Sequence, residues 1–315
     1  MERNKGLLSL KASDFANLFG ASEKEILTHC GEMISGMDFV YRTLGRQERD
    51  TLILKVLRYI YSKELTPAGQ ERLSEWEKGW DENFQQFVAS GYDVDTLVPK
   101  YYKKDVPVRL CRDFVQPIND DFVLHVTKVF RCWIFKKYLQ NVASIYEFGC
   151  GPAHHLAFLT TIFPEKKLIG LDWTNASQKI INLLAQHNGW PIRYEYFNFF
   201  HPDTNLHMEP NSAVFTFGAL EQIGGNHGPF LEFLLEKVPE LCVHIEGIHE
   251  LYNEDYLLDY LALKYHTRRN YLNGFLTRLR QLEKEERIEI IKVHHQQFGN
   301  LFDDPHSYVI WKVKK

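Results

Sequence analysis

The stretch YEFGCGP at Tyr146–Pro152 decides the fold of this chain. It ends a short apolar run that begins at Ser144, turns on Gly149 and Gly151, and precedes a helix-like segment. Glycines at such a turn let the backbone approach a ligand, and the start of the next helix offers free N–H groups. The stretch therefore predicts a strand, a ligand-binding turn and a helix.

Strand-like and helix-like segments alternate beyond this turn. Such alternation predicts a parallel sheet covered by helices on both faces. The last two strand-like segments have only turn-rich residues between them, so as neighbours they must pair antiparallel. We therefore predict an α/β, Rossmann-like domain with a seven-stranded, mostly parallel sheet and an antiparallel C-terminal hairpin. The expected strands are Ser144–Phe148, Lys167–Leu171, Ile192–Tyr196, Ala213–Phe217, Leu241–Ile245, Arg287–Val293 and Ser307–Val313.

The residues before this region are expected to form a helical extension. Trp76, Trp80, Phe84 and Phe87 recur at spacings of three and four, as on one face of a helix. The aromatic face of Trp76 and Trp80 is a candidate homodimer contact. We predict two units: residues 1–118, the extension with a linker or lid, and residues 119–315, the sheet domain.

Prolines punctuate the segment 97–117, which therefore cannot form a long helix. We interpret it as a linker or a lid. Its aromatic residues, Tyr102 among them, are candidates for folding over a bound cofactor, and ordinary packing against the core is the alternative.

Composition excludes several classes of protein. The formal net charge is −4, with acids and bases mixed along the chain, which argues against a nucleic-acid binder. Five cysteines without a CxxC pair are typical of a reducing compartment. The sequence has neither a signal peptide nor a run of about 18 apolar residues. We expect a cytoplasmic protein without a membrane partner.

The charge at the glycine turn predicts the kind of ligand. Glu147 lies two residues before Gly149, where a carboxylate would repel a diphosphate and attract a cation. The third glycine of a dinucleotide GxGxxG fingerprint is replaced by His154. S-adenosylmethionine (SAM), with its ammonium and sulfonium groups, fits this turn better than NAD. An idle, solvated glutamate is the alternative interpretation.

A second carboxylate, Asp172, ends the second expected strand, 21 residues after Gly151. A carboxylate at this place accepts hydrogen bonds from both ribose hydroxyls of a nucleotide. A helix N-cap is the alternative role.

These features resemble the class I SAM-dependent methyltransferase family, over roughly Val142 to Lys315. The matching residues are Glu147 to Gly151, Asp172, Asn198-Phe199 and Ala219-Leu220-Glu221. The family's sheet has seven strands, with the last one antiparallel. This chain departs from the family at Ala153, where a glycine is usual, and at Asn198, where an aspartate is usual.

The resemblance implies a role for each matching residue. Glu147 and the turn Gly149, Cys150 and Gly151 would hold the amino-acid end of SAM, and Asp172 would hold the ribose. Asn198 and Phe199 would flank the adenine with Trp173 stacked nearby, and Ala219 would line the same pocket.

Candidate catalytic residues follow the fourth and fifth strands, where open α/β sheets bind ligands. They are Glu221, His244, Glu246 and His249. Alternation places His244 and Glu246 on one face of a strand, as a base and its orienter, or with Glu250 as part of a metal site. A hydrogen-bonded core histidine is an equal alternative for His244. The histidines show no metal-binding spacing, so we predict no metal site.

The expected activity is transfer of a methyl group from SAM to a small-molecule acceptor, at a hydroxyl oxygen of a sugar or other polar metabolite. The chain lacks the D/N-P-P-Y motif of amine-directed family members, because Phe217–Leu220 stands at that place. The alternatives are an NAD-dependent oxidoreductase and a non-catalytic binding protein with a SAM-type fold.

Overall fold

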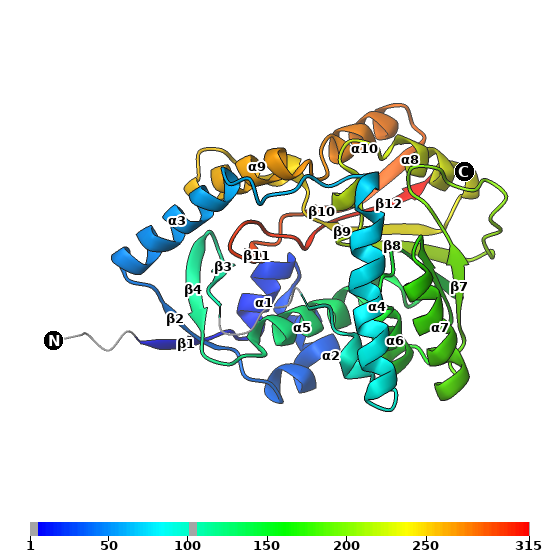
Figure 1. The fold of residues 1–315 in the computed structure, drawn as a ribbon, viewed down its shortest axis with the longest axis horizontal. Coiled ribbons are helices and arrows are strands. Elements are labelled where there is room, and N and C mark those ends of the chain that lie inside the picture. The colour runs from blue at the N-terminus through cyan, green and yellow to red at the C-terminus, as the bar shows by residue number, and fades with distance from the viewer. Residues whose placement is uncertain (1–5, 101–105, 315) are drawn as a thin grey trace.

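The computed structural model describes residues 6–100 and 106–314. Its main element is a seven-stranded sheet with the order β10-β12-β9-β8-β5-β6-β7 (Figure 1). The strands are β5 (Ser144–Phe148), β6 (Lys167–Asp172), β7 (Ile192–Tyr196), β8 (Ser212–Phe217), β9 (Leu241–Glu246), β10 (Ile288–His294) and β12 (Ser307–Val313).

The pairing of these strands confirms the predicted α/β class. β5, β6, β7, β8 and β9 pair in parallel, whereas β12 is antiparallel to both β9 and β10. The expected hairpin is therefore present, and its last strand is inserted between β9 and β10 rather than added at the edge. The order of the strands reverses at β5, so the cleft beyond its carboxyl end is where such sheets bind ligands.

Helices cover both faces of this sheet because apolar residues of its central strands alternate between the two. In β5, Ile145 belongs to the core on the side of α5, and Tyr146 and Phe148 belong to the core on the side of α8 and α10. The helices are α5 (Phe122–Tyr138), α6 (His154–Ile162), α7 (Asn175–Asn188), α8 (Gly228–Lys237) and α10 (Phe275–Lys284). Helix α9 (Leu257–Arg269) packs instead with α3 (Arg46–Ile60). Among the described residues, no helix combines the length and apolar content that crossing a bilayer requires.

The N-terminal region differs from the helical extension that the sequence predicts, because it also forms a five-stranded sheet of order β1-β2-β4-β3-β11. The segment 97–117, expected to be a linker or lid, contributes two of its strands. Both strands are too short for an alternating apolar pattern to be recognised in the sequence. The elements are β1 (Leu7–Ser9), β2 (Val40–Thr43), β3 (Val108–Leu110), β4 (Asp113–Pro117), β11 (Phe298–Gly299), α1 (Ala12–Phe19), α2 (Glu23–Ser35), α3 (Arg46–Ile60) and α4 (Leu73–Ala89).

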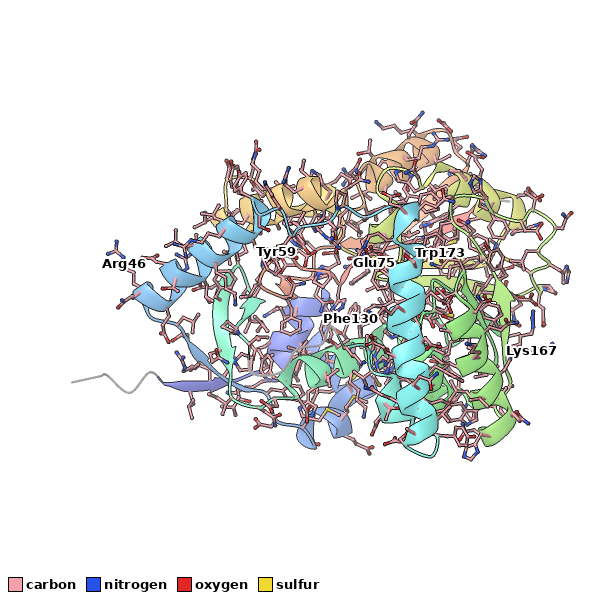
Figure 2. The ribbon with its side chains drawn as sticks, viewed as in Figure 1. Arg46, Tyr59, Glu75, Phe130, Lys167 and Trp173 are labelled. Atoms are coloured by element: carbon pink, nitrogen blue, oxygen red, sulfur yellow. The ribbon has the colours of Figure 1, made fainter. Side chains whose placement is uncertain are left out.

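Contacts between segments far apart in sequence join the N-terminal helices to the rest of the chain. The Tyr308 hydroxyl of β12 donates to the Phe19 carbonyl at 2.7 Å, and Phe19 stacks on Trp133 of α5 at 5.7 Å. The N-terminal helices α1 and α2 thus share one hydrophobic core with α5 and the large sheet. Figure 2 shows Phe130 of α5 inside this shared core.

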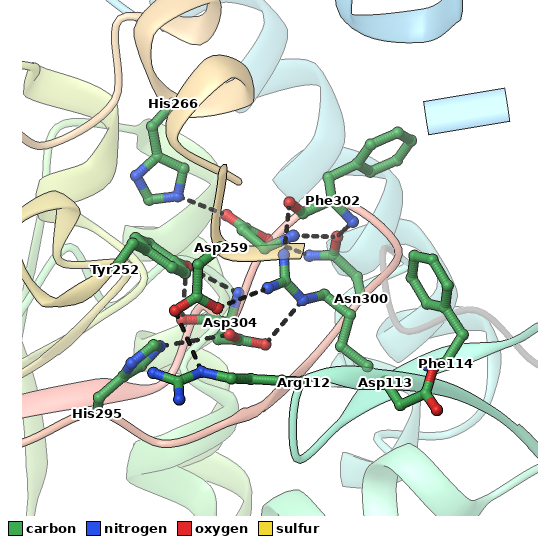
Figure 3. Close-up of polar contacts among 12 residues, drawn as sticks. Arg112, Asp113, Phe114, Tyr252, Asp259, His266, His295, Asn300, Phe302 and Asp304 are labelled. Atoms are coloured by element: carbon green, nitrogen blue, oxygen red, sulfur yellow. Dashed lines mark hydrogen bonds and ion pairs between the residues drawn. The ribbon is translucent and has the colours of Figure 1, made fainter. Parts of the chain in front are cut away.

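A buried ion network joins the two sheets and α9 (Figure 3). Arg109 of β3 is 1% exposed, and its guanidinium lies 3.2 Å from Asp304 and 3.5 Å from Asp259 of α9. Arg112 approaches the other oxygen of Asp259 at 3.3 Å, and His295 lies 3.3 Å from Asp304. The packing of three segments that are distant in sequence therefore depends on one set of buried charges.

Candidate functional site

The glycine turn after β5 adopts the conformation that its sequence predicts. Gly149 and Gly151 have φ angles of +75° and +50°, and the Gly149 and Cys150 N–H groups both donate to the Leu171 carbonyl of β6. A Cβ atom on Gly149 would lie 2.4 Å from the Cβ of Ala219, so only glycine fits there. Ala153, where the family has a glycine, also has a positive φ of 58°. The turn keeps its left-handed backbone even where the glycine is missing.

Glu147 is a buried carboxylate behind this turn. It is 1% exposed, and its Oε2 atom has no hydrogen-bond partner among the described residues. Burial raises the pKa of Glu147 well above its usual value, against the opposing charge of Arg131. A buried polar atom without a partner is rare in folded proteins and indicates a place for a ligand or a water molecule.

Asp172, at the end of β6, supports the same turn. Its Oδ2 atom accepts a hydrogen bond from the Gly151 N–H at 2.9 Å, and its Oδ1 atom accepts from the backbone and hydroxyl of Thr174. Burial raises the pKa of Asp172, and these donors partly offset that increase. Thr174, not Asp172, is the N-cap of α7. The carboxylate thus braces the glycine turn and also reaches the cleft.

The turn opens into a cleft between the ends of β5, β6 and β8. Of the predicted cofactor-binding residues, Gly149, Asp172, Trp173, Phe199 and Ala219 line it. The remaining lining residues are Trp76, Trp80, Phe197, Phe200, Gly218, Gln222 and Ile223.

The other predicted cofactor residues lie beside the cleft rather than in its lining. Glu147, Cys150 and Gly151 lie in and behind the glycine turn, and the Asn198 side chain accepts a hydrogen bond from the Phe200 N–H at 2.9 Å. Tyr102, predicted as part of a lid, lies outside the described residues.

His244 and Glu246, predicted as a pair on β9, lie in different environments. Glu246 is buried, accepts hydrogen bonds from the Ala219 and Glu221 N–H groups at 3.2 Å each, and so fixes the segment after β8. Burial raises the pKa of Glu246 to about 7. His244 is paired with Thr216 at 3.0 Å, and its ring lies in the core beside Phe275, where burial lowers its pKa to about 3.

Glu221 and His249 lie beyond the ends of β8 and β9. Desolvation, together with the nearby carboxylates of Asp303 and Glu246, raises the pKa of Glu221 well above its usual value. His249 is half-buried, and burial lowers its pKa. Glu250, weighed above as a metal ligand, instead accepts a hydrogen bond from the Thr277 N–H of α10. Within residues 6–100 and 106–314, no three His, Cys, Asp or Glu side chains group as metal ligands do.

Trp76 and Trp80 are cleft residues that come from outside the predicted sheet domain and that the sequence did not assign to the site. Their spacing predicts that they share one helix face, and that face is a candidate homodimer contact. The structure places both indoles in the cleft wall, where a Cβ atom on Gly151 would lie 2.9 Å from the Trp80 ring. Helical periodicity identifies an apolar face but not what the face covers.

Comparison with known proteins gives similarity to solved structures only. No model of a known family matches the sequence, and no curated protein matches it. The plantazolicin methyltransferase BpumL in complex with SAH is 11% identical, with 85% of this chain and 97% of that chain covered and a TM-score of 0.39. An O-methyltransferase family 2 protein from Planctomyces limnophilus in complex with apigenin is 10% identical, with 56% of this chain and 52% of that chain covered and a TM-score of 0.40.

The small RNA methyltransferase HEN1 is 12% identical, with 60% of this chain and 25% of that chain covered and a TM-score of 0.45. This chain thus spans about half of the Planctomyces protein and a quarter of HEN1. At these identities and TM-scores the likenesses establish no role for this chain. The seven-stranded sheet has the strand number and the antiparallel last strand that the resemblance implies.

Proposed function

We propose that this chain is a SAM-dependent methyltransferase that modifies a hydroxyl oxygen of a polar small molecule, such as a sugar. The observation that carries the proposal is the buried carboxylate of Glu147, without a partner at Oε2, behind a glycine turn at the reversal point of the sheet.

The residues of the cleft fit SAM better than a dinucleotide. A diphosphate at the turn would add negative charge next to Glu147 and Asp172, whose pKa values burial already raises. An ammonium or sulfonium group would stabilise the ionised form of Glu147. The NAD-dependent alternative is therefore disfavoured.

The proposed roles divide along the cleft. Glu147 and the glycine turn bind the cationic amino-acid end, and Asp172 binds the ribose while it braces Gly151. Trp173 stacks on Phe200 at 6.0 Å and offers, with Phe199, an aromatic surface for the adenine. The cofactor, once bound, supplies an electrophilic methyl group. The protein has to orient the acceptor and exclude water.

We assign the acceptance of the hydroxyl proton to Glu221. It lies in the segment after β8, between Ala219 and Gln222, which line the cleft, and its raised pKa makes it a stronger base than an exposed carboxylate. Glu246 positions Glu221 by accepting its backbone N–H. The formal charge of −4 favours a small molecule over a nucleic acid as the acceptor.

Thermal unfolding with added ligands tests the proposed cofactor. S-adenosylhomocysteine (SAH) and SAM should raise the midpoint by several degrees at concentrations about 100 times the dissociation constant, because a ligand then adds about 2.7 kcal/mol of stability. NADH at equal concentration should leave the midpoint unchanged. Stabilisation by NADH alone would reject the proposal.

Replacing Glu221 by glutamine should slow methyl transfer by about 10²- to 10⁴-fold, because general-base catalysis contributes that much. The rate would be followed with methyl-labelled SAM and a panel of polyhydroxylated acceptors. SAH affinity should change little. The matched control is Glu232→Gln, which alters a surface ion pair with Arg287. An unchanged rate in Glu221→Gln would remove Glu221 from the reaction.

A further inference from the structure

Helix α4 forms a fourth wall of the cleft, in addition to the three strand ends. It is the long helix in front of the sheet in Figure 1, and Figure 2 labels its Glu75. Trp76 and Trp80 of α4 stack on each other at 5.4 Å with an interplanar angle of 27°. Both line the cleft together with the glycine turn and Asp172. This wall comes from the N-terminal region, before the stretch Val142 to Lys315 that carries the sequence resemblance.

Polar contacts fix α4 on both sides of the cleft. The Glu77 carboxylate accepts the N–H groups of Asn175 and Ala176 at 2.8 and 3.0 Å, where it complements the start of α7. On the other side, the Arg72 guanidinium donates to the side-chain oxygen of Gln222 at 3.3 Å. Because these contacts hold α4 at both rims of the cleft, the helix is a fixed part of the site.

The two indoles differ in what surrounds them. The Arg72 guanidinium lies over the Trp76 ring at 5.3 Å, so that ring already has a cation. Among the cation–ring contacts of the described residues, none involves Trp80. The Trp80 ring instead lies against Gly151, at the turn behind which Glu147 is buried with its Oε2 atom unpartnered.

We propose that Trp80 is a cofactor-contacting residue that selects the positively charged sulfonium of SAM over the neutral thioether of SAH. The proposal rests on the proposed function and adds a discriminating residue to it. An indole face attracts a cation through its quadrupole, and the attraction is stronger where water is excluded. Trp80 and Glu147 then act together, one through its ring and the other through its charge. Release of the neutral product SAH becomes easier for the same reason.

Binding measurements on Trp80→Leu separate this role from simple packing. The probes are SAM, SAH and sinefungin, a SAM analogue with an amino group near the sulfonium position. We expect SAM and sinefungin to lose about 3- to 30-fold more affinity than SAH, as the energy range of cation–π contacts implies. Trp80→Phe should retain most of the preference. Trp190→Leu, which removes an indole that does not line the cleft, should keep the wild-type ratio.

A second measurement covers the case in which Trp80→Leu does not fold. Fluorinated tryptophans incorporated at position 80 keep the shape of the ring and weaken its quadrupole stepwise. The logarithm of SAM affinity should then fall with each added fluorine while SAH affinity stays constant. Equal losses for SAM and SAH, or no loss at all, would overturn the role of Trp80. Failure of the wild-type protein to bind any of the three probes would instead reject the proposed function.

Discussion

Replacing Glu147 by glutamine is expected to weaken SAM binding by about 10- to 100-fold, because hydrogen bonds to charged groups contribute about 1.5–3 kcal/mol. Glutamine keeps the size of the side chain and removes its charge. Isothermal titration with SAM at neutral pH measures the loss. Glu75→Gln of α4, which removes the charge of an exposed carboxylate paired with Arg72, is the control and should bind SAM nearly as the wild type does.

The same substitution should stabilise the protein when no cofactor is present, and the effect should depend on pH. Burial raises the folded-state pKa of Glu147 above its unfolded value. The wild-type protein is therefore favoured below the unfolded pKa and loses stability as pH rises through the folded pKa. Urea unfolding at pH 5 and pH 8 should show a larger decline for the wild type than for Glu147→Gln. A difference between the two proteins that does not change with pH would contradict this account.

Replacing Arg109 by methionine is expected to lower the free energy of unfolding by about 3–5 kcal/mol, because it leaves Asp259 and Asp304 buried without their shared cation. Methionine preserves much of the apolar volume of the arginine stem. Urea unfolding at neutral pH measures the change. Because the stability of a domain is about 5–15 kcal/mol, the loss would be a large fraction of the total.

Arg46→Met provides the matched control. Arg46 projects from the end of α3 (Figure 2), its side chain is 96% exposed, and it lies 3.9 Å from Asp50. Exposed pairs of this kind contribute at most about 1 kcal/mol. Similar losses for Arg46→Met and Arg109→Met would show that the buried network has no special weight.

The large sheet could be predicted because its central strands are apolar on both faces and its parallel strands alternate with helices. The small sheet could not, because β1, β3 and β11 have three, three and two residues. Segments so short carry no measurable period of two. The pairing of Phe298–Gly299 with β3 is a long-range event that no local pattern encodes.

The candidate site shows the same limit. Gly149, Asp172 and Glu246 stand at strand ends, where chain order alone fixes their place in the fold. Alternation put His244 and Glu246 on one face, but it could not tell that the His244 ring lies in the core beside Phe275. Trp80 reaches the cleft from a helix more than sixty residues earlier in the chain than the glycine turn, so its position depends on tertiary packing.

The pairing of β11 with β3 has a consequence for the synthesis of the chain. About 190 residues separate Arg109 from its partner Gly299, and at 5–20 residues per second a ribosome needs about 10 to 40 s to translate them. During that interval the edge of β3 and the guanidinium of Arg109 have left the ribosome without their C-terminal partners. β1, β2, β4 and β3 can pair with one another early, but one edge of β3 stays open until β11 has been made. An open strand edge can pair with other chains, so we expect the nascent chain to be most prone to aggregation during this interval.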